Sequence, residues 1–126
     1  MNNLPRICWT TSAIIAFAGM LWGLHMAISG DHSNFPAHAH LNLLGWVSLA
    51  LYGTYYYLAG ITRLLIARIQ VILAIPGSII MGVGIAIAHQ TGAEELAKLG
   101  SLMVIVSAAL FVAITIMRPL RINTVN

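Results

Sequence analysis

Long apolar stretches separated by short polar breaks dominate the pattern of this chain. The stretches cover residues 7–29, 37–60, 64–89 and 95–117, and each has the roughly 20 residues that a helix needs to cross a bilayer. Because the breaks are short, consecutive helices are expected to run in opposite directions. The pattern therefore predicts an all-α integral membrane protein, with four transmembrane helices in an antiparallel bundle that form a single domain over residues 1–126.

Composition supports a chain that lies in the lipid bilayer. Hydrophobic residues make up 60% of the sequence and charged residues only 7%, unlike ordinary soluble domains. The first apolar stretch is longer than the roughly 7 to 15 residues of a signal-peptide core, so it is interpreted as a retained helix. The single cysteine, Cys8, excludes an internal disulfide and is interpreted as a small apolar residue near one membrane face.

Charged residues separate toward the two ends of the predicted bundle. The arginines lie at one end: Arg6, Arg63, Arg68, Arg118 and Arg121. The acidic residues lie in the turns at the other end: Asp31, Glu94 and Glu95. Lys98 is expected to reach the surface there or to pair with Glu94 or Glu95. The positive-inside rule predicts that the arginine end and both termini are cytoplasmic, and so few scattered basic residues do not indicate nucleic-acid binding.

Four tyrosines follow one another closely near the arginine end of the second predicted helix. They are Tyr52, Tyr55, Tyr56 and Tyr57. Aromatic rings are enriched at the membrane interface, so these residues are interpreted as an aromatic belt at the lipid headgroups.

Small residues and a proline predict where helices bend or approach one another. Pro76 lies within the third predicted helix, where a proline favours a kink. Gly19 and Gly23 form a GxxxG pair in the first helix, and Ser78 and Gly82 form a similar pair in the third. Such spacing allows close contact between membrane helices.

All five histidines fall at the end opposite the arginines. His25 lies near the end of the first predicted helix, His38 and His40 open the second, and His89 closes the third. Ionisable residues in membrane helices are costly and usually mark function, and imidazole is the commonest metal ligand. These four residues are therefore the candidate ligands, whereas His32, in the loop, is interpreted as an interfacial side chain.

His38 and His40 cannot easily share one ligand, because residues two positions apart point about 200° apart on a helix. Behind His38 on the same stripe come Asn42 and Gly45, a polar group and then a gap that suits something flat and bulky within the bundle. Behind His40 come Leu44, Val47 and Leu51, an apolar face for packing or for a neighbouring chain. The two histidines are expected to serve two different pockets.

The segment AHAHLNLLGW, residues 37–46, resembles the histidine-bearing helices of heme-copper oxidase subunit I and its nitric-oxide-reductase relatives. The resemblance implies that His38 and His40 are axial ligands of heme b; Asn42 and Gly45, which the helical repeat places behind His38, would line that side of the site. It further implies electron transfer, or binding or chemistry of O2 or NO, on the periplasmic side of a bacterial inner membrane, with a redox partner. His25 and His89 match no motif of that family. The second histidine pair and the His-and-Tyr segment of the family's copper centre are absent from this sequence, so complete oxygen reduction by this chain alone is not implied.

The family fold consists of three arcs of four helices around a pseudo-threefold axis, and one four-helix chain looks like one arc. The resemblance therefore implies a homo-oligomer, specifically a homotrimer, in which His38 of one protomer and His40 of the next face a shared heme.

Two other functions fit the residues. In one, a copper or zinc site forms within one chain from His25, His38 or His40, and His89, with Asp31 or Glu94 as an optional further ligand. Such a protein would act in metal handling or as a small metalloenzyme. In the other, the chain is a small assembly subunit whose histidines only line an interface. The sequence has no G-x-S-x-G motif, no phosphate-binding loop and no charged path through the bilayer centre, so a hydrolase or an ion pump is not expected. Whether the protein is an oxidoreductase is left open.

Overall fold

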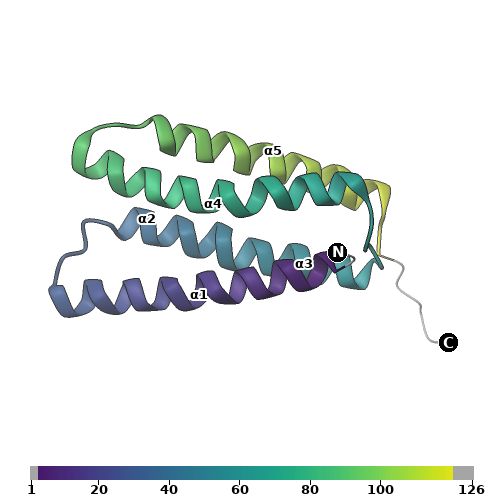
Figure 1. Ribbon diagram of the computed structural model, residues 1–126, viewed down its shortest axis with the longest axis horizontal. Helices are drawn as coiled ribbons and strands as arrows, with labels where there is room; N and C mark the ends of the chain where they lie inside the picture. The colour runs from purple at the N-terminus through teal and green to yellow at the C-terminus, as the bar shows by residue number, and fades with distance from the viewer. Residues whose placement is uncertain (1–2, 121–126) are drawn as a thin grey trace.

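The helices expected from the apolar stretches are all present in the computed structural model, which describes residues 3–120 (Figure 1). The elements are α1 (Leu4–Ser29), α2 (Phe35–His40), η1 (Leu41–Ser48), α3 (Leu49–Leu58), α4 (Leu65–Thr91) and α5 (Glu95–Met117). Since α2, η1 and α3 follow one another without a break, they form one long composite helix, and the fold has four helices as predicted. The helices α1, α4 and α5 are each long and apolar enough to cross a membrane, which indicates a multi-pass membrane protein.

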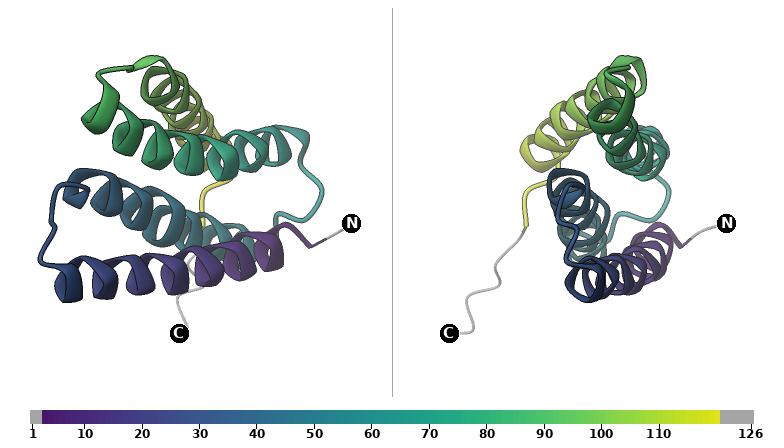
Figure 2. Two further views of the ribbon diagram at one scale, coloured as in Figure 1. Left: turned by 60° about the vertical axis from the view of Figure 1, so that its left-hand side comes forward. Right: turned by 90° about the vertical axis from the view of Figure 1, so that its left-hand side faces the viewer.

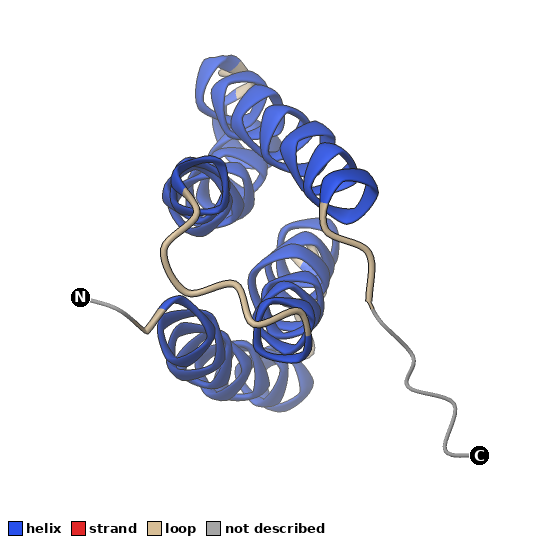
Figure 3. Ribbon diagram, turned by 90° about the vertical axis from the view of Figure 1, so that its right-hand side faces the viewer, coloured by secondary structure: helices blue, strands red, loops and turns tan. Residues whose placement is uncertain are grey.

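The composite helix lies between α1 and α4, and α5 packs chiefly on α4 (Figures 1 and 2). Both ends of the described chain and the α3–α4 connection lie together, as Figure 3 shows from that side. We call this the arginine end, because Arg6, Arg63 and Arg118 lie there; Arg121 is outside the described residues. The opposite end, which carries loop 30–34 and turn 92–94, is called the histidine end.

Glycines terminate α1 and α4, the two helices whose C-terminal ends lie at the histidine end. Gly30 follows α1 with a φ of 70°, and Gly92 follows α4 with a φ of 78°. This left-handed conformation ends a helix readily only at glycine, because a Cβ would be strained there. At the start of α5, Lys98 Nζ lies 2.9 Å from Oε2 of Glu94 in the preceding turn, so the predicted pairing of Lys98 is confirmed with Glu94.

The α4–α5 contact depends on glycines that the sequence pattern did not single out. A methyl group built on Gly84 would overlap the backbone of Leu96 and Ala97, and one on Gly100 would overlap the backbone of Met81. The two helix backbones therefore touch, as is common where small residues line a membrane-helix interface. α4 continues through Pro76 without interruption.

Tyr56 is part of the core, so the interpretation as an aromatic belt is wrong for this residue. Tyr56 is fully buried, and Tyr52 and Tyr55 are half-buried and pack on Phe111 with ring centroids 4.4 and 5.3 Å apart. Tyr57 is 75% exposed, as a headgroup contact would be, and for the half-buried Tyr52 and Tyr55 the belt stays a prediction. The helical repeat directs neighbouring tyrosines to different faces, and three of those faces point into the protein.

A chain of hydrogen bonds crosses this core and links three helices. The hydroxyl of Tyr56 donates to Gln70 Oε1 at 2.7 Å, and Gln70 Nε2 donates to Ser107 Oγ at 2.9 Å. The Ser107 hydroxyl in turn donates to the Gln70 carbonyl at 3.1 Å. All three side chains are buried, so each polar atom in this chain finds its partner within the protein. Cys8 is buried in the same core, which confirms its interpretation as a small apolar residue.

Candidate functional site at the histidine end

A π-helix begins directly after His40 and is the most unusual backbone feature of the site. It spans Leu41–Ser48 in the middle of the composite helix. Two side chains of this segment donate to backbone carbonyls: Asn42 Nδ2 donates to the His38 carbonyl of α2 at 2.9 Å, and Ser48 Oγ donates to the Leu43 carbonyl within the π-helix at 2.9 Å. π-helical turns are rare and frequently occur at functional sites. The α-helical repeat used on the sequence gives no sign of this segment.

The His38 side of the composite helix packs directly against α1. A methyl group on Gly23 would lie 3.1 Å from His38 Cε1, and one on Gly19 would overlap the amide of Asn42. The ring of Trp22 meets that of His38 edge-on, with centroids 6.1 Å apart. The predicted close contact of the GxxxG pair is therefore confirmed, and its partner is the His38 stripe.

This packing corrects the expectation of a gap behind His38. Asn42 and Gly45 do lie on the same side as His38, as the repeat predicts, but α1 fills the space that they leave. A methyl group on Gly45 would lie 2.9 Å from the Cγ2 of Ile15. A flat, bulky group therefore has no room behind His38 within one chain, because the glycines of α1 let the two helices meet at van der Waals distance.

The second small-residue pair meets the composite helix from α4. A methyl group on Gly82 would lie 3.2 Å from the Cβ of Leu41, and one on Gly45 would lie 3.2 Å from the hydroxyl of Ser78. Ser78 and Gly82 thus make the close approach that their spacing predicts. The π-helix is held between α1 and α4, so the backbone around the histidine pair is fixed on both of these sides.

His40 has a different environment from His38. Its Nδ1 lies 2.7 Å from the carbonyl oxygen of Pro36, one turn earlier. A carbonyl only accepts hydrogen bonds, so Nδ1 carries the proton and Nε2 keeps a free lone pair. Metal-binding histidines are commonly oriented by such a bond from the second ring nitrogen. Pro36 was not singled out from the sequence. Its spacing of four residues before His40 is the signal that could have identified it, because residues four apart lie one turn apart on the same side of a helix.

The helix face on the His40 side is apolar and uncovered. Leu43, Val47 and Leu51 are 58%, 40% and 61% exposed, respectively. Leu44, which was expected on this face, is half-buried instead. His40 therefore lies at the end of an apolar strip that no other part of the described chain covers.

The remaining histidines lie at the same end of the molecule but do not gather around one point. His25, His32 and His89 are exposed, and His32 Nδ1 lies 3.1 Å from the Gly30 carbonyl. The pKa of Asp31 is lowered, chiefly because the backbone N–H of Ser33 bonds its carboxylate, with smaller contributions from His32 and His89. His89 is thus close enough to loop 30–34 to contribute to the lowered pKa of Asp31.

A metal site within one chain does not form from these residues. Among residues 3–120, no three His, Cys, Asp or Glu side chains lie close enough together to hold one metal ion. The copper or zinc site expected from His25, His38 or His40, and His89 therefore has no counterpart in this part of the chain. His38 packs against Gly23 and Trp22 of α1, the Nδ1 of the half-buried His40 lies against the Pro36 carbonyl, and His25 and His89 are exposed on α1 and α4.

Comparisons with known proteins give no match for this chain among family models, curated proteins or solved structures.

Proposed function

We propose that this chain is a membrane heme protein in which His40 supplies an axial ligand. The observation that carries the proposal is the 2.7 Å contact between His40 Nδ1 and the Pro36 carbonyl. It fixes the ring and its tautomer, and it leaves Nε2 free on an uncovered face. An unpaired polar nitrogen on a membrane helix is costly, so its retention favours a functional role.

The His40 face suits one side of a heme. A porphyrin is flat and largely apolar, and it needs apolar side chains against its face as well as the ligand. Leu43, Val47 and Leu51 provide such a surface below His40. The chain supplies only one wall, however, so the second wall has to come from another protein surface. We therefore propose a homo-oligomer, with a trimer as the arrangement implied by the family resemblance, in which the heme lies between neighbouring copies.

His38 is not suited to the role of the opposite ligand. Its half-buried ring packs on Gly23 and Trp22, so α1 occupies part of the space that a ligand from a neighbouring protomer would need. His25 and His89 are exposed at the same end, and a neighbouring copy has access to them. A bound heme iron transfers electrons when both axial positions are filled and binds O2 or NO when one is open. We propose that His25 or His89 of a neighbouring copy determines, by binding the iron or leaving it open, whether the protein transfers electrons or binds O2 or NO.

Charge supports the proposed orientation. The arginines gather at the end opposite the histidines, so the positive-inside rule assigns the histidine end to the periplasmic side of a bacterial inner membrane. A redox partner then approaches from the periplasm, where loop 30–34 and turn 92–94 surround the site.

Heme content in purified variants tests the proposal. His40→Ala is expected to lose bound heme, whereas His32→Ala, in the loop at the same end, is expected to retain it. Circular dichroism of each variant verifies that the helices are intact. Equal heme in both variants would refute the role of His40. Stoichiometric copper or zinc without iron in the purified protein would refute the heme and indicate a copper or zinc site shared between copies. Separate His25→Ala and His89→Ala variants identify the second ligand by a change in the iron's spin state.

A further inference from the structure

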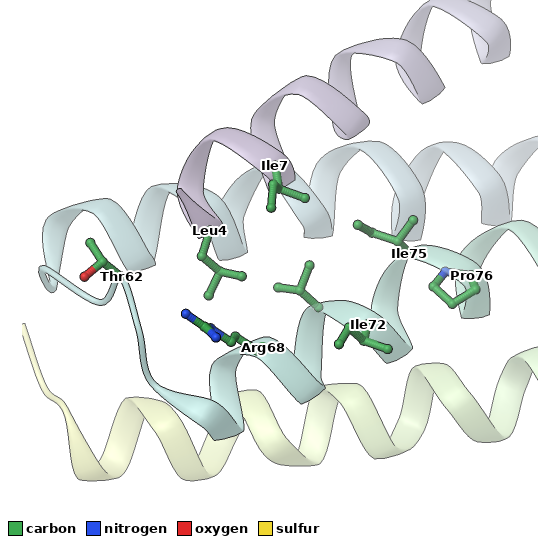
Figure 4. A pocket seen from close by; sticks show the side chains of 8 residues that line it. Leu4, Ile7, Thr62, Arg68, Ile72, Ile75 and Pro76 are labelled. Atoms are coloured by element: carbon green, nitrogen blue, oxygen red, sulfur yellow. The ribbon is translucent and has the colours of Figure 1, made fainter. Parts of the chain in front are cut away.

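A groove at the arginine end lies between α1 and α4, far from the histidines (Figure 4). Its volume is about 480 Å³. Most of its lining is aliphatic, with one cation and one hydroxyl at the end nearest the α3–α4 connection. The lining residues are Leu4, Ile7, Thr62, Arg68, Val71, Ile72, Ile75 and Pro76.

Arg68 is the one charged side chain among these lining residues, and the described chain gives it no anion. Figure 4 shows its side chain extending from α4 toward Leu4 of α1, across the groove. The acidic side chains, Asp31, Glu94 and Glu95, are all at the opposite end of the molecule. Within residues 3–120 the salt bridge found is that of Lys98 with Glu94. Arg68 is half-buried as a residue, and a cation with no carboxylate beside it favours an anion from outside the described chain.

We propose that this groove binds an anionic phospholipid, with the headgroup phosphate on Arg68 and one acyl chain along α4 toward Pro76. The guanidinium fork matches phosphate oxygens, and the Thr62 hydroxyl is a second donor at the same end. From Arg68 to Pro76 the helix rises about 12 Å, which is enough to seat a long segment of an acyl chain. Basic side chains between helices at the cytoplasmic side are a known form of lipid recognition site.

The two parts of the groove have different tasks. An acyl chain gains little from leaving the bilayer for an equally apolar wall, so the aliphatic residues orient the lipid rather than drive its binding. The selective contribution comes from Arg68, which favours a headgroup with net negative charge over a zwitterionic one. This site is independent of the heme proposed at the histidine end.

Lipid binding to the full chain tests the proposal. The protein is reconstituted in phosphatidylcholine nanodiscs with increasing phosphatidylglycerol, and bound lipid is measured by native mass spectrometry. Wild type is expected to retain phosphatidylglycerol, and Arg68→Gln to bind it about tenfold more weakly, as loss of a charge-assisted hydrogen bond implies. Arg63→Gln is the matched control, because Arg63 is exposed at the same end and does not line the groove. Equal losses in the two variants would indicate diffuse attraction to basic residues and overturn the proposal.

Two further arms separate the lipid from a free anion and from a folding defect. In the first arm, the melting temperature of the protein in phosphatidylcholine nanodiscs is measured with added inorganic phosphate and, separately, with added phosphatidylglycerol. Phosphatidylglycerol is expected to raise the melting temperature and inorganic phosphate is not. An equal rise with inorganic phosphate would assign the site to a free anion. Ile75→Trp keeps Arg68 but fills the groove, so it is expected to lower phosphatidylglycerol retention while the melting temperature in phosphatidylcholine stays near that of wild type. Unchanged retention in Ile75→Trp would remove the acyl-chain part of the proposal.

Discussion

Removal of one hydroxyl from the buried core is expected to destabilise the protein measurably. In Tyr56→Phe, Gln70 Oε1 loses the donor that lies 2.7 Å away, and both residues are fully buried. An unsatisfied buried acceptor costs about 1 to 3 kcal/mol in proteins, whereas hydrogen bonds between membrane helices average about 0.6 kcal/mol with a maximum near 1.7. Because no water reaches Gln70 to replace the hydroxyl, we expect about 1 to 1.5 kcal/mol, a change of roughly five- to twelvefold in the unfolding equilibrium.

The matched control is Tyr57→Phe, which removes the same atom from the neighbouring, 75% exposed ring and is expected to change stability by less than about 0.5 kcal/mol. Reversible unfolding in mixed micelles, followed by circular dichroism, measures both. The double variant Tyr56→Phe with Gln70→Met removes donor and acceptor together, so it is expected to be less destabilised than the sum of the single changes. Equal stability of Tyr56→Phe, Tyr57→Phe and wild type would refute the role given to this hydrogen-bond chain.

Three further outcomes follow from the packing and the charges. Gly84→Ala forces a methyl group against the backbone of Ala97, which cannot rotate away, so we expect the free energy of unfolding to fall by about 1 to 3 kcal/mol in the same assay. The control Val83→Ala, at the exposed neighbouring position, is expected to cause no such loss. In Gly19→Ala the nearest atoms to the new methyl group belong to the Asn42 amide, which can move, so we expect a loss of about 1 kcal/mol in the free energy of unfolding. Because Asn42 Nδ2 lies 3.3 Å from His38 Nδ1, the NMR signals of the His38 ring are expected to shift, and unchanged signals would contradict this packing. The Ser33 N–H holds the pKa of the Asp31 carboxyl below its ordinary value. The hydrogen bond therefore stabilises loop 30–34 fully at a pH above the ordinary pKa, and this stabilisation is lost as the pH falls through the lowered pKa. Amide hydrogen exchange at Ser33 measures this loss.

Much of the fold was predictable because membrane helices depend on length and hydrophobicity. The predicted stretch 95–117 coincides with α5 (Glu95–Met117), and the other stretches differ from their helices by a few residues. Both GxxxG-like pairs make the contacts that their spacing predicts, since only small residues permit backbones to approach so closely. Gly84 and Gly100 were missed because they lie on different helices, and no spacing within one helix reveals such a pair.

The candidate site was predictable only in part. The α-helical repeat correctly grouped Asn42 and Gly45 with His38, but it does not say whether a gap left by glycine is empty or is filled by a neighbouring helix. Here Gly19 and Gly23 bring α1 into that gap, and the ligand candidate with an oriented ring is the half-buried His40 instead. The tyrosines illustrate the same problem, because an amphipathic ring suits both a headgroup layer and a buried hydrogen bond. Only the position of Gln70 on another helix distinguishes the two for Tyr56.

The central claim is that His40 holds a heme at the surface between copies of this chain. The most direct measurement is the absorption spectrum of the protein purified from membranes, recorded oxidised and reduced, on a particle whose mass is determined at the same time. We expect a Soret band that shifts on reduction, on a particle larger than one chain. A particle without a Soret band, even after reconstitution with heme, or a heme-loaded monomer, would contradict the claim.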